Sequence, residues 1–209
     1  MKVLGVHWCP KRDQFCFKVD MNKLVFPART PRQLVSIQCS LYDPNGFVSP
    51  FIWLGRRMLQ KATAGGRGWD SPLDPKLLEQ FYVWTSSIPL LENYPIKRWW
   101  ETNETMDSQD ISWHFFSDAS LEGYGVVVYR RVVGPVVPPL VHGKIHVSLI
   151  MSRSHVVPLD SSKASHHGSM PRLETVANTK SVKTRTFLTK IFGKLGRVLH
   201  HSDSEPSLK

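Results

Sequence analysis

The sequence is poor in cysteine, in acidic residues and in long apolar runs. Its 209 residues include three cysteines, Cys9, Cys16 and Cys39, and no Cys-x-x-Cys pair. That usage excludes a disulfide framework and a cysteine-based zinc site, and it is typical of a reducing compartment. No stretch approaches the roughly 18 consecutive apolar residues that a membrane span needs. We therefore expect an intracellular protein without a membrane partner, in the cytoplasm or the nucleus.

The shortage of acids leaves a strongly basic chain. Lys and Arg number 27 against 17 Asp and Glu, which gives a net charge of +10 and a pI near 9.7. Between residues 163 and 201 there are eight Lys or Arg and one acid. Such a balance favours a polyanionic partner such as nucleic acid. A basic surface without any such partner is the alternative.

The first hundred residues predict a hairpin followed by about three helices. Residues 2–20 show the two-residue alternation of half-buried strands around the turn "PKRD". Proline follows a capping residue at Thr30 and at Ser49, which is typical of helix starts. A third helix is predicted over residues 74–88, where one buried stripe is formed by Leu77, Phe81, Trp84 and Ile88.

After a polar, acidic stretch at residues 101–110, the pattern changes to strands. Segments 111–118, 123–133 and 144–157 are rich in β-branched and aromatic residues. A long helix is predicted over 170–195, with Leu188, Ile191, Phe192 and Leu195 on one face, and a short strand over 196–205. We therefore expect an α+β protein whose second half has the order β-β-β-α-β.

An acid stands at three informative places in that order. Asp118 ends the first strand, Glu174 lies in the first turn of the helix, and Asp203 ends the last strand. If the two strands are neighbours, their ends lie about 5 Å apart. Three converging carboxylates repel one another unless a divalent cation lies between them, and Mg²⁺ prefers such oxygen ligands. The sequence thus predicts a magnesium site of the kind used in phosphodiester cleavage.

Each acid also has an ordinary structural explanation. An acid just after a strand is often a turn residue. Glu174 could complement the helix dipole, and Asp203 could cap a following helix. The order of the three acids is more specific than any one of them, but spacing alone leaves both interpretations open.

The sequence resembles the Pol region of BEL/Pao-type retrotransposons, a family often catalogued as the Pao retrotransposon peptidase. The resemblance covers nearly the whole chain and keeps the family's motif order. The matching stretches are "VLGVHWCPKRDQFCF", "TPRQLVSIQCSLYDPNGFVSP", "MLQ" followed by "GWDSPL", "FFSDASLEGYGVVVY", "SRSHVVPL", "MPRLE" and "SDSE".

This resemblance implies a domain plan. Residues 1–100 would be the end of a reverse transcriptase, with a hairpin and thumb or connection helices. Residues 101–111 would be a linker, and residues 112–209 a ribonuclease H-like mixed β-sheet with one long helix, incomplete at its C-terminal end. The partners would be an RNA–DNA hybrid or another nucleic acid and the remainder of the Pol polyprotein.

The resemblance also implies roles for individual residues. Asp118, Glu174 and Asp203 would be catalytic and would bind Mg²⁺ or Mn²⁺, while water attacks the RNA strand. By position and charge, the candidate contacts to nucleic acid are Ser120, Arg172, Lys180, Lys183 and Arg185.

The chain departs from the family in several respects. It has no Tyr-x-Asp-Asp polymerase motif, and the fourth acid of the ribonuclease H pattern is absent. We therefore expect the fragment to be weak or inactive alone, and a non-catalytic nucleic-acid-binding remnant is the alternative. An aspartic peptidase is the least favoured alternative, because neither "SDASLEG" nor "SDSEP" has the Asp-Thr-Gly or Asp-Ser-Gly sequence of that active-site loop.

Overall fold

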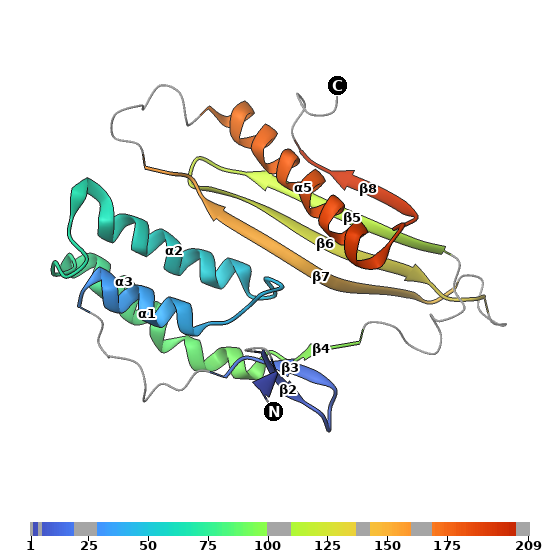
Figure 1. The fold of residues 1–209 in the computed structure, drawn as a ribbon, viewed down its shortest axis with the longest axis horizontal. Coiled ribbons are helices and arrows are strands. Elements are labelled where there is room, and N and C mark those ends of the chain that lie inside the picture. Colours follow the sequence, from blue (N-terminus) through green and yellow to red (C-terminus); the bar gives the residue numbers. More distant parts are fainter. Residues whose placement is uncertain are drawn as a thin grey trace. The chain divides into compact units, whose positions relative to one another are not determined.

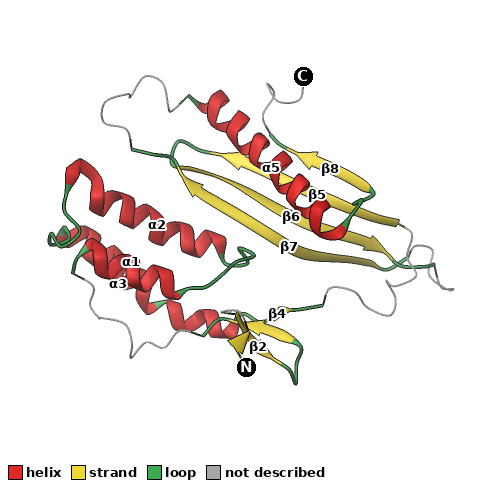
Figure 2. Cartoon of the chain, viewed as in Figure 1, coloured by secondary structure: helices red, strands yellow, loops and turns green. Residues whose placement is uncertain are grey.

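A computed structural model describes residues 2–3, 6–18, 29–99, 110–136, 143–159 and 169–203. The chain divides into two compact units (Figures 1 and 2). A helical unit comprises Met1–Pro44, Val48–Trp99 and Pro158–Ser162, and a sheet unit comprises Asn45–Phe47, Trp100–Val157 and Lys163–Lys209. The architecture is mixed α and β, with two sheets, as expected.

The helical unit contains the three predicted helices. Its elements are α1 (Pro31–Ser40), α2 (Ser49–Thr63), the 3-10 helix η2 (Ala64–Gly66), α3 (Pro75–Ser86) and the 3-10 helix η3 (Ile88–Asn93). The predicted cap at Thr30 is confirmed, because its side chain accepts a hydrogen bond from the Gln33 amide. The predicted cap at Ser49 is wrong: Ser49 is already helical, and Val48 donates its amide to Asp43 Oδ2 at 2.8 Å.

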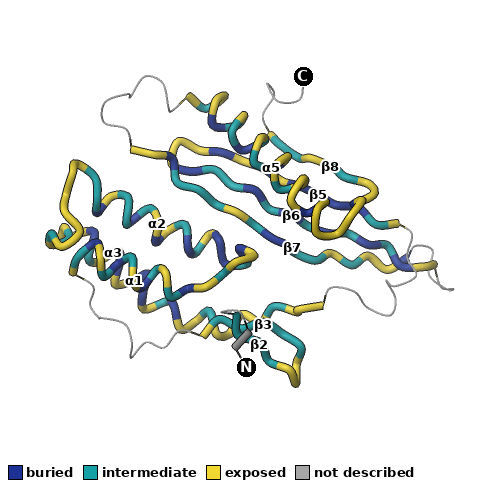
Figure 3. The backbone as a smooth tube through the Cα atoms, in the orientation of Figure 1, coloured by how far each residue is buried: buried dark blue, intermediate teal, exposed yellow. Residues whose placement is uncertain are grey.

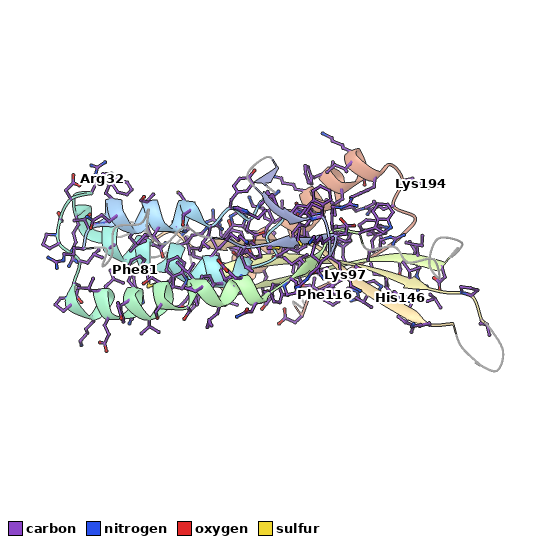
Figure 4. The ribbon with its side chains drawn as sticks, turned by 90° about the horizontal axis from the view of Figure 1, so that it is seen from below. Arg32, Phe81, Lys97, Phe116, His146 and Lys194 are labelled. Carbon is purple, nitrogen blue, oxygen red and sulfur yellow. The ribbon has the colours of Figure 1, made fainter. Side chains whose placement is uncertain are left out.

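The predicted stripe of α3 forms the centre of this unit's core. Phe81 and Ile88 are 1% exposed and pack with Leu34 and Ile37 of α1. Figure 4 shows Phe81 among the helices. Gly55 of α2 allows a close approach, since a Cβ there would lie 2.7 Å from the Trp84 ring. The helices are thus held together by apolar packing.

A small antiparallel sheet also belongs to the helical unit. Its strands are β1 (Lys2–Val3), β2 (Val6–Cys9), β3 (Gln14–Cys16) and β4 (Ile96–Lys97), in that order. The predicted hairpin is confirmed by the pairing of Trp8 with Phe15. All three cysteines are free.

The sheet unit confirms the predicted order β-β-β-α-β. Its elements are β5 (Asp110–Ala119), β6 (Gly123–Val133), β7 (Ile145–Val156), α5 (Met170–Phe192) and β8 (Arg197–His201). The strand order is β7-β6-β5-β8, and β8 pairs with β5 in parallel while the other pairs are antiparallel. The two acid-bearing strands are therefore neighbours.

Helix α5 crosses one face of this sheet (Figure 1). Residues of β5 alternate between the helix face and the opposite face, as the burial in Figure 3 indicates. Trp113 and Phe115 pack with Leu188 of α5 in one core cluster. Ile191 and Phe192, predicted on one helical face with Leu188, are 55% and 43% exposed. The ring of Phe192 still lies 5.6 Å from that of Trp113 on β5.

Some expectations fall outside the described residues. They concern most of the stretch at 101–110, residues 19–20 of the predicted hairpin and residues 204–205 of the predicted last strand. Within the parts of the chain that are described, no helix combines the length and apolar character required to cross a bilayer.

Candidate functional site

The pairing of β5 with β8 makes neighbours of the two strands that lead to Asp118 and Asp203. In this parallel pair Ser112 lies opposite Arg197 and Phe116 opposite His201, a constant offset of 85 residues. The recorded pairing ends there, and Asp203 follows β8 by two residues. If the register continued, Asp203 would lie opposite Asp118, about 4.8 Å away at the same end of the sheet.

Helix α5 runs antiparallel to β5 and brings Glu174 to the same end. Phe192, at its last turn, lies 5.6 Å from Trp113 between ring centroids, and Asn178 accepts a hydrogen bond from the Ser117 hydroxyl at 2.6 Å. Glu174 precedes Asn178 by four residues, about 6 Å along the helix axis. Two strand residues cover about the same length, so Glu174 lies at the level of Ala119.

The expectation that Glu174 lies in the first helical turn is wrong. The helix begins at Met170, and its first turn contains no acidic residue. The helix dipole acts mainly on the first turn. The dipole explanation of Glu174 is therefore weakened.

The three acids approach this end from two faces of the sheet. Ser117 faces α5, so Asp118 points to the opposite face by alternation, and Asp203 would do so if the register of β8 continued past His201. Asp118 Oδ1 accepts a hydrogen bond from the Ala119 amide at 2.7 Å. Among the described residues, no three His, Cys, Asp or Glu side chains form a group that could hold a metal ion.

The donor set nevertheless fits a divalent cation by its chemistry and its location. Carboxylate oxygens are the ligands that Mg²⁺ and Mn²⁺ take, and Asp118 and Asp203 are both exposed at one strand end. Glu174 could join them only around the end of β5. The position of α5 along the strand thus decides whether the third carboxylate can take part.

A cluster of rings that the sequence did not predict covers the face opposite α5. His114 Nδ1 lies 3.0 Å from His201 Nε2, and His114 Nε2 lies 3.0 Å from Ser112 Oγ. Phe116 stacks on His201 at 4.4 Å and meets Tyr129 edge-on at 6.0 Å between centroids. Its members could have been found only from the β5–β8 register.

Two histidines near this site favour the neutral form. The pKa of His114 lies below its ordinary value because burial disfavours the charged ring, with further contributions from His201, Arg131 and Arg197. The pKa of His200 is lowered by burial, then by Arg185 and His201.

His200 also makes a contact across the interface with α5. Its Nδ1 lies 2.8 Å from the hydroxyl of Ser181, which is buried in the helix. The ring stacks on Phe115 at 5.0 Å between centroids. His200, exposed near the end of β8, thus contacts residues of both β5 and α5.

The candidate nucleic-acid contacts lie in two places. The Ser120 hydroxyl is used in the β5–β6 turn, where it donates to the Gly123 carbonyl at 3.1 Å and accepts from the Glu122 and Gly123 amides. The cationic candidates all lie on α5; Lys180 is half-buried, whereas the others are exposed, namely Arg172, Lys183 and Arg185. Their contact with nucleic acid stays a prediction.

Comparisons with known proteins agree with this topology. Residues 30–204 match the family model described as "Pao retrotransposon-like RNaseH-like domain". No curated protein matches the chain.

Two solved structures are similar to the chain at low sequence identity. One is a foamy viral protease-reverse transcriptase dRH in complex with ds DNA, with a TM-score of 0.51 and 15% identity, covering 100% of this chain and 32% of that one. The other is the foamy viral protease-reverse transcriptase in complex with dsDNA, with a TM-score of 0.46 and 15% identity, covering 100% and 38%. The chain thus spans about a third of the length of these proteins. At this identity the first similarity shows the fold alone.

Proposed function

The chain belongs to the Pao retrotransposon-like RNaseH-like domain family, and from that premise we propose that its sheet unit is a ribonuclease H-type nuclease module. The proposed substrate is an RNA–DNA hybrid, and the proposed cofactor is Mg²⁺ or Mn²⁺. One observation supports the proposal: β5 and β8 pair in parallel, so that Asp118 and Asp203 follow neighbouring strand positions, and α5 is bonded to β5 one helical turn after Glu174.

In this proposal the chain's own residues have distinct tasks. Asp118 and Asp203 would hold the cation from the face opposite α5, and Glu174 would reach it around the end of β5. A bound divalent cation supplies stabilisation of the charge that develops during phosphodiester hydrolysis. Lys183 and Arg185, exposed on α5, would neutralise phosphates of the hybrid and fix its position without reading its sequence.

The test is cleavage of a labelled RNA–DNA hybrid by the full chain with Mg²⁺ or Mn²⁺. Asp118→Asn should lower the rate by about 100-fold or more, which corresponds to about 2.7 kcal/mol of transition-state stabilisation. Asp110→Asn is the matched control, because Asp110 stands on the same strand and face but at its opposite end. Equal rates for wild type and Asp118→Asn would rule out the proposed site.

The second candidate is a non-catalytic nucleic-acid-binding protein. It is favoured by the absence of a three-ligand group among the described side chains. Binding that weakens steeply with salt, without metal-dependent cleavage, would support it.

The helical unit would then correspond to the end of a reverse transcriptase. Support comes from the foamy viral protease-reverse transcriptase, whose similarity covers the helical unit as well as the sheet unit. By its hairpin and helices this unit would resemble the thumb or connection, and the rest of the Pol polyprotein would be its partner. Weaker hybrid binding after removal of positive charge from α2, as in Lys61→Gln, would support this assignment.

A further inference from the structure

The interface between α5 and the sheet changes character along the helix. Toward its C-terminal end it is apolar, where Leu188 packs with Trp113 and Phe115. Near its N-terminal end it is apolar again, where Leu173 and Ala177 pack with Ala119 and Val157. Between these two apolar patches, two polar pairs cross it. The Ser117 hydroxyl donates to Asn178 Oδ1 at 2.6 Å, and Ser181 Oγ lies 2.8 Å from His200 Nδ1. We call these four residues the polar seam.

The polar seam is not explained by stability. Asn178 Nδ2 is buried and has no hydrogen-bond partner among the described residues. A buried donor without an acceptor is destabilising, and an apolar residue of similar size would avoid that loss. Ser181, 1% exposed, likewise occupies a helix position where an apolar side chain would bury more surface. The polar pairs therefore call for a reason other than folding free energy.

The polar seam has members on β5, α5 and β8. On each of these elements, one member is close in sequence to one of the three acids. Ser117 directly precedes Asp118 on β5. Asn178 follows Glu174 by one helical turn on the same side of α5. His200, on β8, precedes Asp203 by three residues. The polar seam thus joins the three elements that carry the acids, close to the end where those acids lie.

Because hydrogen bonds are directional, they can fix the position of a helix that apolar packing alone would leave free to shift. A helix on an apolar surface can slide or rotate slightly with little loss of buried area, whereas a hydrogen bond weakens steeply as its distance and angle change. Since Ser117 faces α5 and Asp118 faces away by alternation, a small shift of α5 along the strand would change the distance between Glu174 and Asp118.

We propose that Asn178 and Ser181 are positioning residues, which act through Ser117 and His200 to fix α5 on β5 and β8 and thereby set Glu174 relative to Asp118 and Asp203. This inference rests on the proposed function for its consequence, but the fixing of α5 can be measured without it. Buried polar groups that select one arrangement at some cost in stability are known from other helical interfaces.

The test compares four variants of the full chain. Asn178→Leu and Ser117→Ala break the Ser117–Asn178 bond, and Ser117→Thr retains the hydroxyl. Leu188→Ala is the matched control, because it weakens the same helix–sheet interface at its apolar end. Three quantities are measured: the Mn²⁺ dissociation constant, hydrogen exchange of residues 170–178, and the thermal midpoint.

Asn178→Leu and Ser117→Ala should raise the Mn²⁺ dissociation constant about 10-fold, as the loss of residues that orient metal ligands does elsewhere. They should also speed exchange in the first two turns of α5 while leaving the thermal midpoint near that of wild type. Ser117→Thr should restore both quantities. Leu188→Ala should lower the midpoint and leave Mn²⁺ affinity unchanged while the protein is folded.

The positioning role is wrong if Asn178→Leu and Ser117→Ala bind Mn²⁺ as wild type does, or if Leu188→Ala weakens binding equally. If wild type itself binds no Mn²⁺, the proposed metal site fails instead. In that case hydrogen exchange in α5 tests whether the polar seam fixes the helix. Faster exchange confined to the Ser117 and Asn178 variants supports this fixing, and unchanged exchange overturns it.

Discussion

The helical unit and the sheet unit bury their helices in different ways. In the helical unit, α1 and α3 contribute apolar side chains such as Leu34, Ile37 and Phe81 to one core cluster, and none of these three is more than 1% exposed. The buried hydroxyl of Thr85 bonds within its own helix, to the Phe81 carbonyl at 3.0 Å. In the sheet unit, α5 instead sends Asn178 and Ser181 across to the strands.

The difference shows what each contact contributes. Apolar burial contributes most of the stability and is roughly proportional to the area removed from water. Polar pairs contribute less net free energy, but they fix distance and direction. The helical unit is packed mainly by apolar side chains, together with the bond from Trp84 Nε1 of α3 to the Phe51 carbonyl of α2 at 2.9 Å. In the sheet unit, polar side-chain pairs join α5 to two strands.

The largest effect in a test of this contrast is expected when a large buried side chain is removed from the core of the helical unit. Phe81→Ala should lower the free energy of unfolding of that unit by about 3–5 kcal/mol, the usual loss for a buried Phe. Hydrogen exchange of the full chain would localise the loss. Equal loss of protection in α1–α3 and in β5–β6 would contradict the separation into two interiors.

A smaller effect is expected from a methyl group added between α2 and α3. Gly55→Ala would place Cβ 2.7 Å from Trp84 Cζ2, and such overpacking costs about 1–3 kcal/mol. Leu54→Ala, at a neighbouring position 48% exposed, is the control and should change the urea midpoint little. An unchanged midpoint for Gly55→Ala would show that α2 can move away from α3 without loss.

The sheet unit, in contrast, should lose stability in mild acid. Folding lowers the pKa of His114 and His200, so the unfolded chain binds more protons near and below pH 6.5. Their contribution is complete above that pH and is lost as the pH falls through the lowered values. The groups facing these rings are His201, Arg131, Arg197 and Arg185.

Thermal midpoints measured at pH 8.0 and pH 5.5, which lie about 1 unit or more above and below the ordinary histidine pKa, would give the size of this loss. In His114→Phe/His200→Phe the difference between the two midpoints should shrink. A difference as large as that of wild type would exclude these rings as its source.

The smallest effect is expected at an exposed ion pair of the helical unit. Arg32 Nε lies 2.8 Å from Asp70 Oδ1, but both side chains are more than half exposed. Solvent screens such pairs, so Arg32→Gln should leave the urea midpoint within error of wild type. A clear decrease would show that surface ion pairs also stabilise this unit.

Much of the fold follows from local patterns. The stripe Leu77, Phe81, Trp84 and Ile88 repeats at helical spacing and is buried, and the β-branched segments became β5, β6 and β7. The predictions that failed concern positions whose structure depends on contacts outside the local sequence pattern. Ser49 is already helical, and Val48, whose amide donates to Asp43 Oδ2, stands at the cap position. Helix α5 ends at Phe192 and does not include Leu195, which packs in the core of the sheet unit.

The candidate site was predicted only in its residue types and order. Acids after two strands and within a helix suggested a shared end of the sheet, and the pairing of β5 with β8 agrees with that. The face on which Asp118 lies, the histidine contacts and the polar seam could not be predicted. They depend on which residues of separate strands and helices come opposite one another.

The sequence by itself determined the elements, because hydrophobic period and turn residues act over a few positions along the chain. Only the tertiary structure decided the offset between β5 and β8 and the place of α5 along them. Those depend on bonds between residues 61 or more positions apart, such as Ser117 with Asn178 and His114 with His201. No local pattern encodes such distances, and the proposed chemistry of Asp118, Glu174 and Asp203 depends on them.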